Sequence, residues 1–155
     1  MFREAGAGSL PVFVSSVIIE APVAEVFRFH EREDALALLT PSFPPVRIVS
    51  RTGGIQVGAR VELRVMGFRW LALHTGYERN RFFVDEQITG PFAKWIHRHE
   101  FEAVKRGTRM TDRVEYVLPG GSLVNRMLAW TMRPGLSRMF AHRHRVTRRI
   151  CEAGR

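Results

Sequence analysis

The sequence predicts an α+β domain in which a curved antiparallel sheet of about six to seven strands wraps around a long C-terminal helix. Three observations predict this fold. Strand-like stretches follow one another through most of the chain, and their short connections are typical of an antiparallel meander. Two segments near the N-terminus carry apolar residues at helical spacing. The final segment has no strand alternation and is instead typical of one amphipathic helix.

The first strand is expected at 13–20, where β-branched residues are concentrated. Pro22 stands where a first helical turn begins, and the apolar spacing after it predicts a helix over 22–31. A second short helix is expected at 33–39, ended by the prolines that follow. Six further strands are expected at 46–51, 60–66, 69–78, 82–89, 95–103 and 109–117.

The last helix is expected over 122–152, lying across the concave face of the sheet. Pro134-Gly135 is expected to kink or interrupt this helix, because proline cannot continue the hydrogen-bond ladder. The residues at helical spacing that form its expected apolar stripe are Leu123, Met127, Trp130, Met139, Phe140, Val146 and Ile150.

The composition is that of one globular domain, with 155 residues, 45% hydrophobic and 25% charged. We expect residues 1–10 to form a flexible N-terminal tail and 11–152 to form a single ligand-binding domain. No stretch is long enough to predict a membrane span, and the N-terminus lacks the features of a signal peptide. A lone cysteine, Cys151, cannot build a disulfide framework and fits a reducing compartment. We therefore expect a cytoplasmic protein.

The net charge of +9 raises the question of a nucleic-acid partner. However, the segment 133–155 holds seven arginines and one acid, Glu152, and so carries +6 of this charge. A basic helix end exposed to solvent is the default interpretation. An anionic membrane surface is the second interpretation, and we do not expect nucleic acid. The arginines that would face the membrane are Arg143, Arg145, Arg148 and Arg149.

The strands 95–103 and 109–117 sort into two faces at a period of two. One face of each strand is charged and must meet water, so the other face is interior. That interior face nevertheless carries His97, His99 and Asp112, and burying unpartnered polar groups costs roughly 1–3 kcal/mol each. A lined cavity explains them better than an ordinary core. The inward residues, our candidate ligand-binding set, are Asp85, Gln87, Trp95, His97, His99, Phe101, Met110, Asp112, Val114 and Tyr116.

Several chemical roles fit the polar members of this set. They can satisfy one another in an internal hydrogen-bond network, or orient the polar head of an apolar ligand. His97, His99 and Asp112 could form a two-histidine, one-carboxylate metal site, although we expect no metal and no cofactor. His97 or His99 paired with Asp85 or Asp112 could perform acid–base catalysis, because imidazole titrates near neutral pH.

Two other histidines are less informative. The sequence does not decide whether His74 faces the interior, and we expect His30 at the surface or at its boundary.

A series of motifs carries a family resemblance over residues 10–150. These motifs are Gln87-Ile-Thr-Gly-Pro-Phe92, Trp95-Ile-His-Arg-His99, Gly107-Thr-Arg-Met-Thr-Asp112, Val114-Glu-Tyr116 and Met139-Phe140. The chain resembles the START-like or SRPBCC superfamily, whose fold is the helix grip. Within it the chain looks most similar to the polyketide cyclase/dehydrase and lipid-transport group, in a mostly unassigned bacterial branch.

The resemblance implies a deep hydrophobic cavity between the sheet and the C-terminal helix. It implies binding or transport of a hydrophobic small molecule, lipid-like or polyketide-like. A fold alone does not fix a function, so two alternatives stay open. One is a cyclase- or dehydrase-type enzyme that uses the inner histidines and aspartates, and the other is a membrane-surface protein that uses the basic C-terminal helix.

Overall fold

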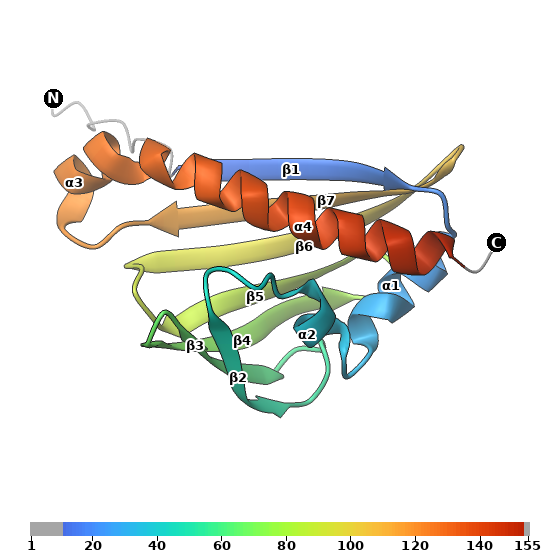
Figure 1. The fold of residues 1–155 in the computed structure, drawn as a ribbon, viewed down its shortest axis with the longest axis horizontal. Coiled ribbons are helices and arrows are strands. Elements are labelled where there is room, and N and C mark those ends of the chain that lie inside the picture. The colour runs from blue at the N-terminus through green and yellow to red at the C-terminus, as the bar shows by residue number, and fades with distance from the viewer. Residues whose placement is uncertain (1–10, 154–155) are drawn as a thin grey trace, which may run out of the picture.

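The computed structural model describes residues 11–153, and the tail expected at 1–10 lies outside this range. Along the chain, a first strand is followed by two helices, six strands and a helical C-terminus (Figure 1). They are β1 (Val12–Ile19), α1 (Val23–Glu31), α2 (Ala35–Leu39), β2 (Val46–Thr52), β3 (Arg60–Val65), β4 (Phe68–Glu78), β5 (Phe82–Thr89), β6 (Lys94–Val104), β7 (Gly107–Val117), α3 (Gly121–Leu128), the 3-10 helix η1 (Ala129–Met132) and α4 (Arg133–Glu152). The predicted α+β helix-grip architecture is confirmed.

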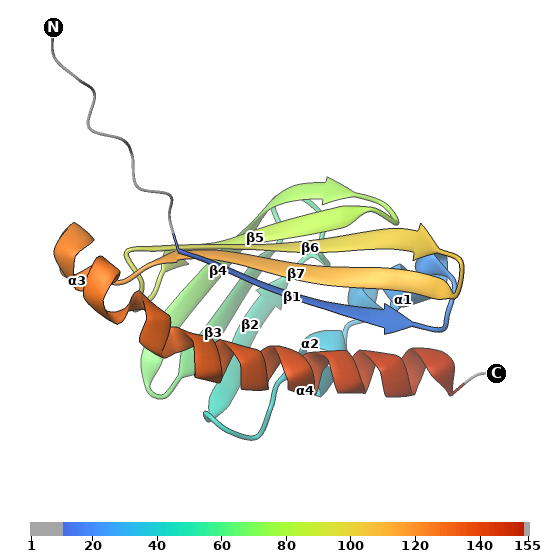
Figure 2. The same cartoon turned by 90° about the horizontal axis from the view of Figure 1, so that it is seen from above.

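All seven strands belong to one antiparallel sheet with the order β1-β7-β6-β5-β4-β3-β2. Strands β2 to β7 form a meander, and β1 closes the far edge by pairing with β7. Figures 1 and 2 show α4 running along one face of the sheet, with α1 and α2 beside the C-terminal part of α4. The sheet and α4 therefore enclose the interior between them.

The helical C-terminus differs from the single helix expected at 122–152. It is divided into α3, η1 and α4, and the break lies before Pro134 rather than at it. Pro134 occupies the first turn of α4, where a backbone without an N–H loses no hydrogen bond. The proline therefore helps to start the long helix instead of kinking it.

The apolar stripe expected on this helix is continuous only within α4. Leu123, Met127 and Trp130 are 58%, 61% and 68% exposed, whereas Phe140 is fully buried. The reason is that α3 extends beyond the end of the sheet, so its apolar side chains meet no opposing layer (Figure 2). Periodicity predicted which residues share a face, but not which part of that face is covered.

The core contains three hydrophobic clusters, and two of them flank the polar site. One lies under α1 and contains Phe27, Phe83, Phe101 and Met110. The other lies under α4 and contains Phe13, Trp95, Val114, Tyr116, Leu136 and Phe140. The neighbouring side chains His97 and His99 connect them, because the ring of His97 lies 5.1 Å from that of Phe140 and His99 stacks on Phe83 at 3.9 Å. The polar site thus lies between the two apolar halves.

Candidate functional site

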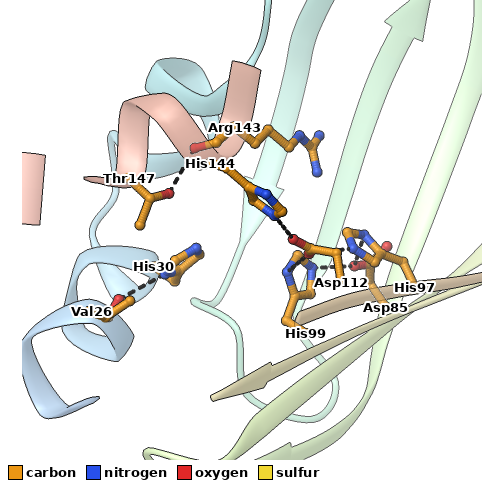
Figure 3. A network of polar contacts seen from close by, with 9 residues as sticks. All are labelled: Val26, His30, Asp85, His97, His99, Asp112, Arg143, His144 and Thr147. Carbon is orange, nitrogen blue, oxygen red and sulfur yellow. Dashed lines mark hydrogen bonds and ion pairs between the residues drawn. The ribbon is translucent and has the colours of Figure 1, made fainter. Parts of the chain in front are cut away.

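Strand register brings the polar residues of the inner face together. Asp85 of β5 lies opposite His97 of β6, and His99 of β6 lies opposite Asp112 of β7. Because these strands are neighbours, four polar side chains gather on one face at the centre of the sheet (Figure 3). The parity of the strands predicted this gathering from the sequence alone.

Asp112 is the centre of the network. Its Oδ1 lies 2.9 Å from His97 Nε2 and 2.9 Å from His99 Nδ1. Its Oδ2 lies 2.7 Å from Nε2 of His144, which descends from α4 (Figure 3). This buried carboxylate is therefore surrounded by three imidazoles, one of them supplied by the opposite layer.

Asp85 faces the same two histidines from the other side. Its Oδ2 lies 3.4 Å from His99 Nε2 and 3.6 Å from His97 Nδ1. The two imidazoles, whose ring centroids are 3.8 Å apart, are thus held between two carboxylates. Each histidine directs one ring nitrogen toward Asp112 and the other toward Asp85.

The pKa values of the carboxylates are lowered despite their burial. Burial alone would raise the pKa of Asp112, but hydrogen bonds from His144, His97 and His99 hold it well below its usual range. Burial likewise opposes ionisation of Asp85, yet the His99 hydrogen bond and the neighbouring histidine charges lower its pKa to about 2. Both aspartates are therefore ionised at neutral pH.

The pKa values of the two histidines of β6 are shifted in opposite directions. Burial and the neighbouring His99 charge lower the pKa of His97, whereas the pKa of His99 is raised because its bonds to Asp112 and Asp85 outweigh burial. His97 donates its Nε2–H to Asp112, and both ring nitrogens of His99 face carboxylates. His99 is therefore the more readily protonated of the two imidazoles at the cavity wall.

A cavity of about 500 Å³ lies between the sheet and the helices. Most of its lining is apolar and comes from α2, β3, β4 and α4, with Leu39, Leu63, Trp70 and Met139 as examples. Four residues of the sequence-predicted set line it as well: Asp85, Trp95, His97 and His99.

The other six inward residues lie on the predicted face but behind or beside the cavity. Gln87 fixes the following turn, since its Nε2 donates to the Phe92 carbonyl at 2.8 Å, and Asp112 lies beneath the histidines. The Tyr116 hydroxyl donates to the Ala129 carbonyl at 2.7 Å. The remaining three pack into the core clusters and are Phe101, Met110 and Val114. Strand parity identifies an inward face, but the packing of α1 and α4 decides which part of it remains uncovered.

Two further histidines, His30 and His74, also line the cavity. His30 was expected at the surface or at its boundary but is 5% exposed, lines the cavity and donates Nδ1–H to the Val26 carbonyl at 2.8 Å. Its burial, together with the nearby His99 charge, lowers its pKa to about 4. His74 also lines the cavity, donates Nδ1–H to the Ile55 carbonyl at 3.0 Å and has a pKa lowered by burial.

The sequence interpretation placed the C-terminal helix over the cavity but missed the polar side chains that α4 contributes to the site. His144 follows Leu136 and Phe140 at intervals of four residues and shares their buried face, a signal that the spacing did contain. Arg143 was grouped with the basic surface, but it lines the cavity and its Nε atom is buried. Of the same group, Arg145 and Arg149 are exposed, and Arg148 donates to the Ile18 carbonyl at 2.7 Å.

Asp85, His97 and His99 also form the set whose geometry resembles a metal site. One ligand atom from each lies within 4.8 Å of the others. The carboxylate of this set is Asp85, whereas the sequence interpretation used Asp112, whose two oxygens bond His97 and His144.

Comparison with known proteins places the chain in a family. The model of the family "Polyketide cyclase / dehydrase and lipid transport" matches residues 19–145, which include most of the sheet and most of α4. The chain belongs to this family. No curated protein matches it in sequence at a significant level. Within residues 11–153, none of the helices is both long and apolar enough to cross a membrane.

Solved structures share the fold. A nucleoside-diphosphate sugar epimerase from Corynebacterium glutamicum is 27% identical with a TM-score of 0.70, and the match covers 88% of this chain but 28% of the epimerase. The protein TTHA0849 from Thermus thermophilus is 18% identical with a TM-score of 0.63, covering 88% of this chain and 97% of that one. StfQ, the di-domain ARO/CYC of the steffimycin biosynthetic pathway, is 13% identical with a TM-score of 0.68, covering 92% of this chain and 51% of StfQ. At these identities, TTHA0849 and StfQ support the fold alone.

Proposed function

We propose that this member of the polyketide cyclase/dehydrase and lipid transport family binds a hydrophobic small molecule, lipid-like or polyketide-like, in the cavity between the sheet and α4. The observation that carries the proposal is the cavity of about 500 Å³ with a largely apolar lining. A volume of this size is typical of small-molecule sites. Burial of apolar ligand surface supplies most of the affinity, at roughly 25 cal/mol per Å².

The polar groups at the centre of the sheet orient such a ligand. Asp85, His97 and His99 face the cavity, while Trp95 and Trp70 cover the wall beside them. A ligand that is apolar along its body and polar at one end can satisfy both kinds of lining. Polar groups of this kind add little to total affinity but select the ligand's direction in the cavity.

Displacement of a neutral fluorescent hydrophobic probe tests the proposal, together with native mass spectrometry of what co-purifies. Ala72 is buried on β4 and lines the cavity, so Ala72→Trp fills it and is expected to abolish binding; Leu63→Trp does the same from β3. Val14→Trp is the matched control, because Val14 is 50% exposed. Binding that survives both cavity-filling variants, or a wild-type protein that binds no lipid or aromatic molecule, contradicts the proposal.

A cyclase- or dehydrase-type enzyme is the second candidate function. The observation that favours it is the pair of stacked histidines at the wall of an apolar cavity, of which His99 has a raised pKa and His97 a lowered pKa. Such a pair can protonate a carbonyl oxygen and accept a proton from an adjacent carbon, as an aldol cyclisation with dehydration requires. The test is turnover of a β-ketone substrate. Loss of turnover in both His97→Gln and His99→Gln, with ligand affinity retained, supports this function. Unchanged turnover in both variants contradicts it.

An anionic membrane surface is a third candidate, favoured by the spacing of Arg145, Arg148 and Arg149 on one exposed face of α4. The test is sedimentation with anionic vesicles at increasing salt. Replacement of all three arginines by glutamine is expected to remove salt-sensitive binding, and unchanged binding would exclude this surface.

A further inference from the structure

Arg143 is a cationic residue of the cavity wall, and no carboxylate among residues 11–153 forms an ion pair with its guanidinium. It lies on α4 one turn beyond Met139, on the face that lines the cavity. Figure 3 shows its side chain extending from the helix toward the sheet, with no dashed line from its guanidinium to any residue drawn. Its Nε atom is buried and has no hydrogen-bond partner among residues 11–153.

The carboxylates nearest to Arg143 are already engaged. Asp112 accepts hydrogen bonds from His97 and His144, and Asp85 faces His99 at 3.4 Å. Asp112 and Asp85 therefore act on the guanidinium only as distant charges, while burial lowers the pKa of Arg143. The aromatic ring of Phe140 lies 5.6 Å from the guanidinium carbon and gives modest stabilisation of its charge.

A buried charge without a hydrogen-bonded partner is costly, and the cost is removed when an anion supplies one. A guanidinium is planar and matches a carboxylate through two parallel hydrogen bonds. The apolar lining of the same cavity leaves room for a long hydrocarbon or aromatic body. The charge and the lining thus favour one ligand chemistry.

We infer that the cavity selects amphipathic carboxylic acids, whose carboxylate pairs with Arg143 while the apolar body lies along α2, β3 and β4. This inference rests on the proposed binding function. The negative charge of Asp85 does not exclude a second carboxylate, because ring nitrogens of His99 and His97 lie 3.4 Å and 3.6 Å from the Asp85 carboxylate and offset it. Arg143 is then the specificity-determining residue of the ligand site.

The test compares dodecanoate with its methyl ester, which has the same body and no charge, by displacement of neutral N-phenyl-1-naphthylamine. Wild-type protein is expected to bind the acid about 10- to 100-fold more tightly than the ester, the range of a hydrogen bond to a charged group. Arg143→Met keeps an apolar stem but removes the charge, and is expected to abolish this preference. Arg143→Lys keeps the charge without the paired geometry and should retain part of it.

Arg138→Met is the matched control, because Arg138 is exposed on the same helix and its loss changes net charge equally. It should preserve the preference for the acid. Equal affinity for acid and ester in the wild type, or the same ratio in Arg143→Met, overturns the inference and leaves hydrophobic binding intact. If acid, ester and dodecanol all fail to displace the probe, the binding function itself fails.

Discussion

His144 of α4 donates a hydrogen bond of 2.7 Å to Asp112 of β7, so one buried carboxylate joins the long helix to the centre of the sheet. The same carboxylate bonds both histidines that face the cavity. The position of α4, the orientation of the two imidazoles and the protonation of His99 therefore depend on one side chain.

Removal of the Asp112 charge is expected to destabilise the fold strongly. Asp112→Asn leaves His99 without one of its two carboxylates and places an amide among three imidazoles, and breaking a buried charged pair costs about 3 to 5 kcal/mol. Urea unfolding measures the free energy. Glu102→Gln is the control, since its ion pair with Arg109 is exposed and is worth less than about 1 kcal/mol. A loss below about 1 kcal/mol in Asp112→Asn would show that the network does not hold the layers together.

Protonation of His30 is expected to weaken the fold between pH 6.5 and pH 4. Its pKa falls from 6.5 to about 4 on folding, so the unfolded chain takes up the proton first as the pH drops. The stability that His30 contributes is complete above pH 6.5 and is lost progressively to pH 4, by about 3 kcal/mol.

Unfolding free energies at several pH values, measured for the wild type and His30→Phe, isolate this contribution. Phenylalanine fits a site lined by Phe29, Phe83 and Phe101 and cannot be protonated. The variant should show a shallower decrease over this interval. Identical pH profiles for the two proteins would mean that His30 is not kept neutral by burial.

A chelator is expected to leave the thermal midpoint unchanged. A metal held by Asp85, His97 and His99 competes with protonation of His99, whose pKa is raised by its bonds to Asp112 and Asp85. A metal must displace a proton that two carboxylates favour. Thermal unfolding with and without EDTA, followed by addition of Zn²⁺, checks this. A midpoint that falls with EDTA and recovers with Zn²⁺ identifies a resident metal site.

The two tryptophans Trp130 and Trp95 are expected to differ widely in their importance for stability. Trp130 is 68% exposed beyond the sheet, so Trp130→Ala should change the unfolding free energy by about 0.5 kcal/mol or less. Trp95 is 7% exposed and packs against Trp70 and Phe92, so Trp95→Ala should cost about 3 to 5 kcal/mol. Equal losses would place Trp130 on the core stripe that its spacing suggested.

Local patterns predicted the strands, the two short helices and the inward direction of His97, His99, Asp112 and Asp85. A period of two is a property of the strand itself, so no tertiary information was needed. His144 and Arg143 reach the site because α4 crosses the sheet at one particular angle and height. That placement depends on the packing of whole layers, which the sequence of one helix does not determine.

The burial of His30 also depends on how the layers pack. The spacing of apolar residues in α1 does not decide whether His30 faces the interior. It is buried because α1 covers the aromatic side chains of β5 and β6. The strands and the presence of a lined cavity could be predicted, but the volume of the cavity could not. Its volume is what remains after all the helices have packed.

The attachments of α4 determine where the interior can open. The helix is tied to β7 through His144 and to β1 through Arg148, whereas the wall formed by Pro44, Met66 and Phe68 comes from connecting segments and a strand end at the opposite side. Met66 and Phe68 are each 62% exposed although they also line the cavity. The cavity therefore meets solvent at this rim, away from the strands to which the long helix is hydrogen-bonded.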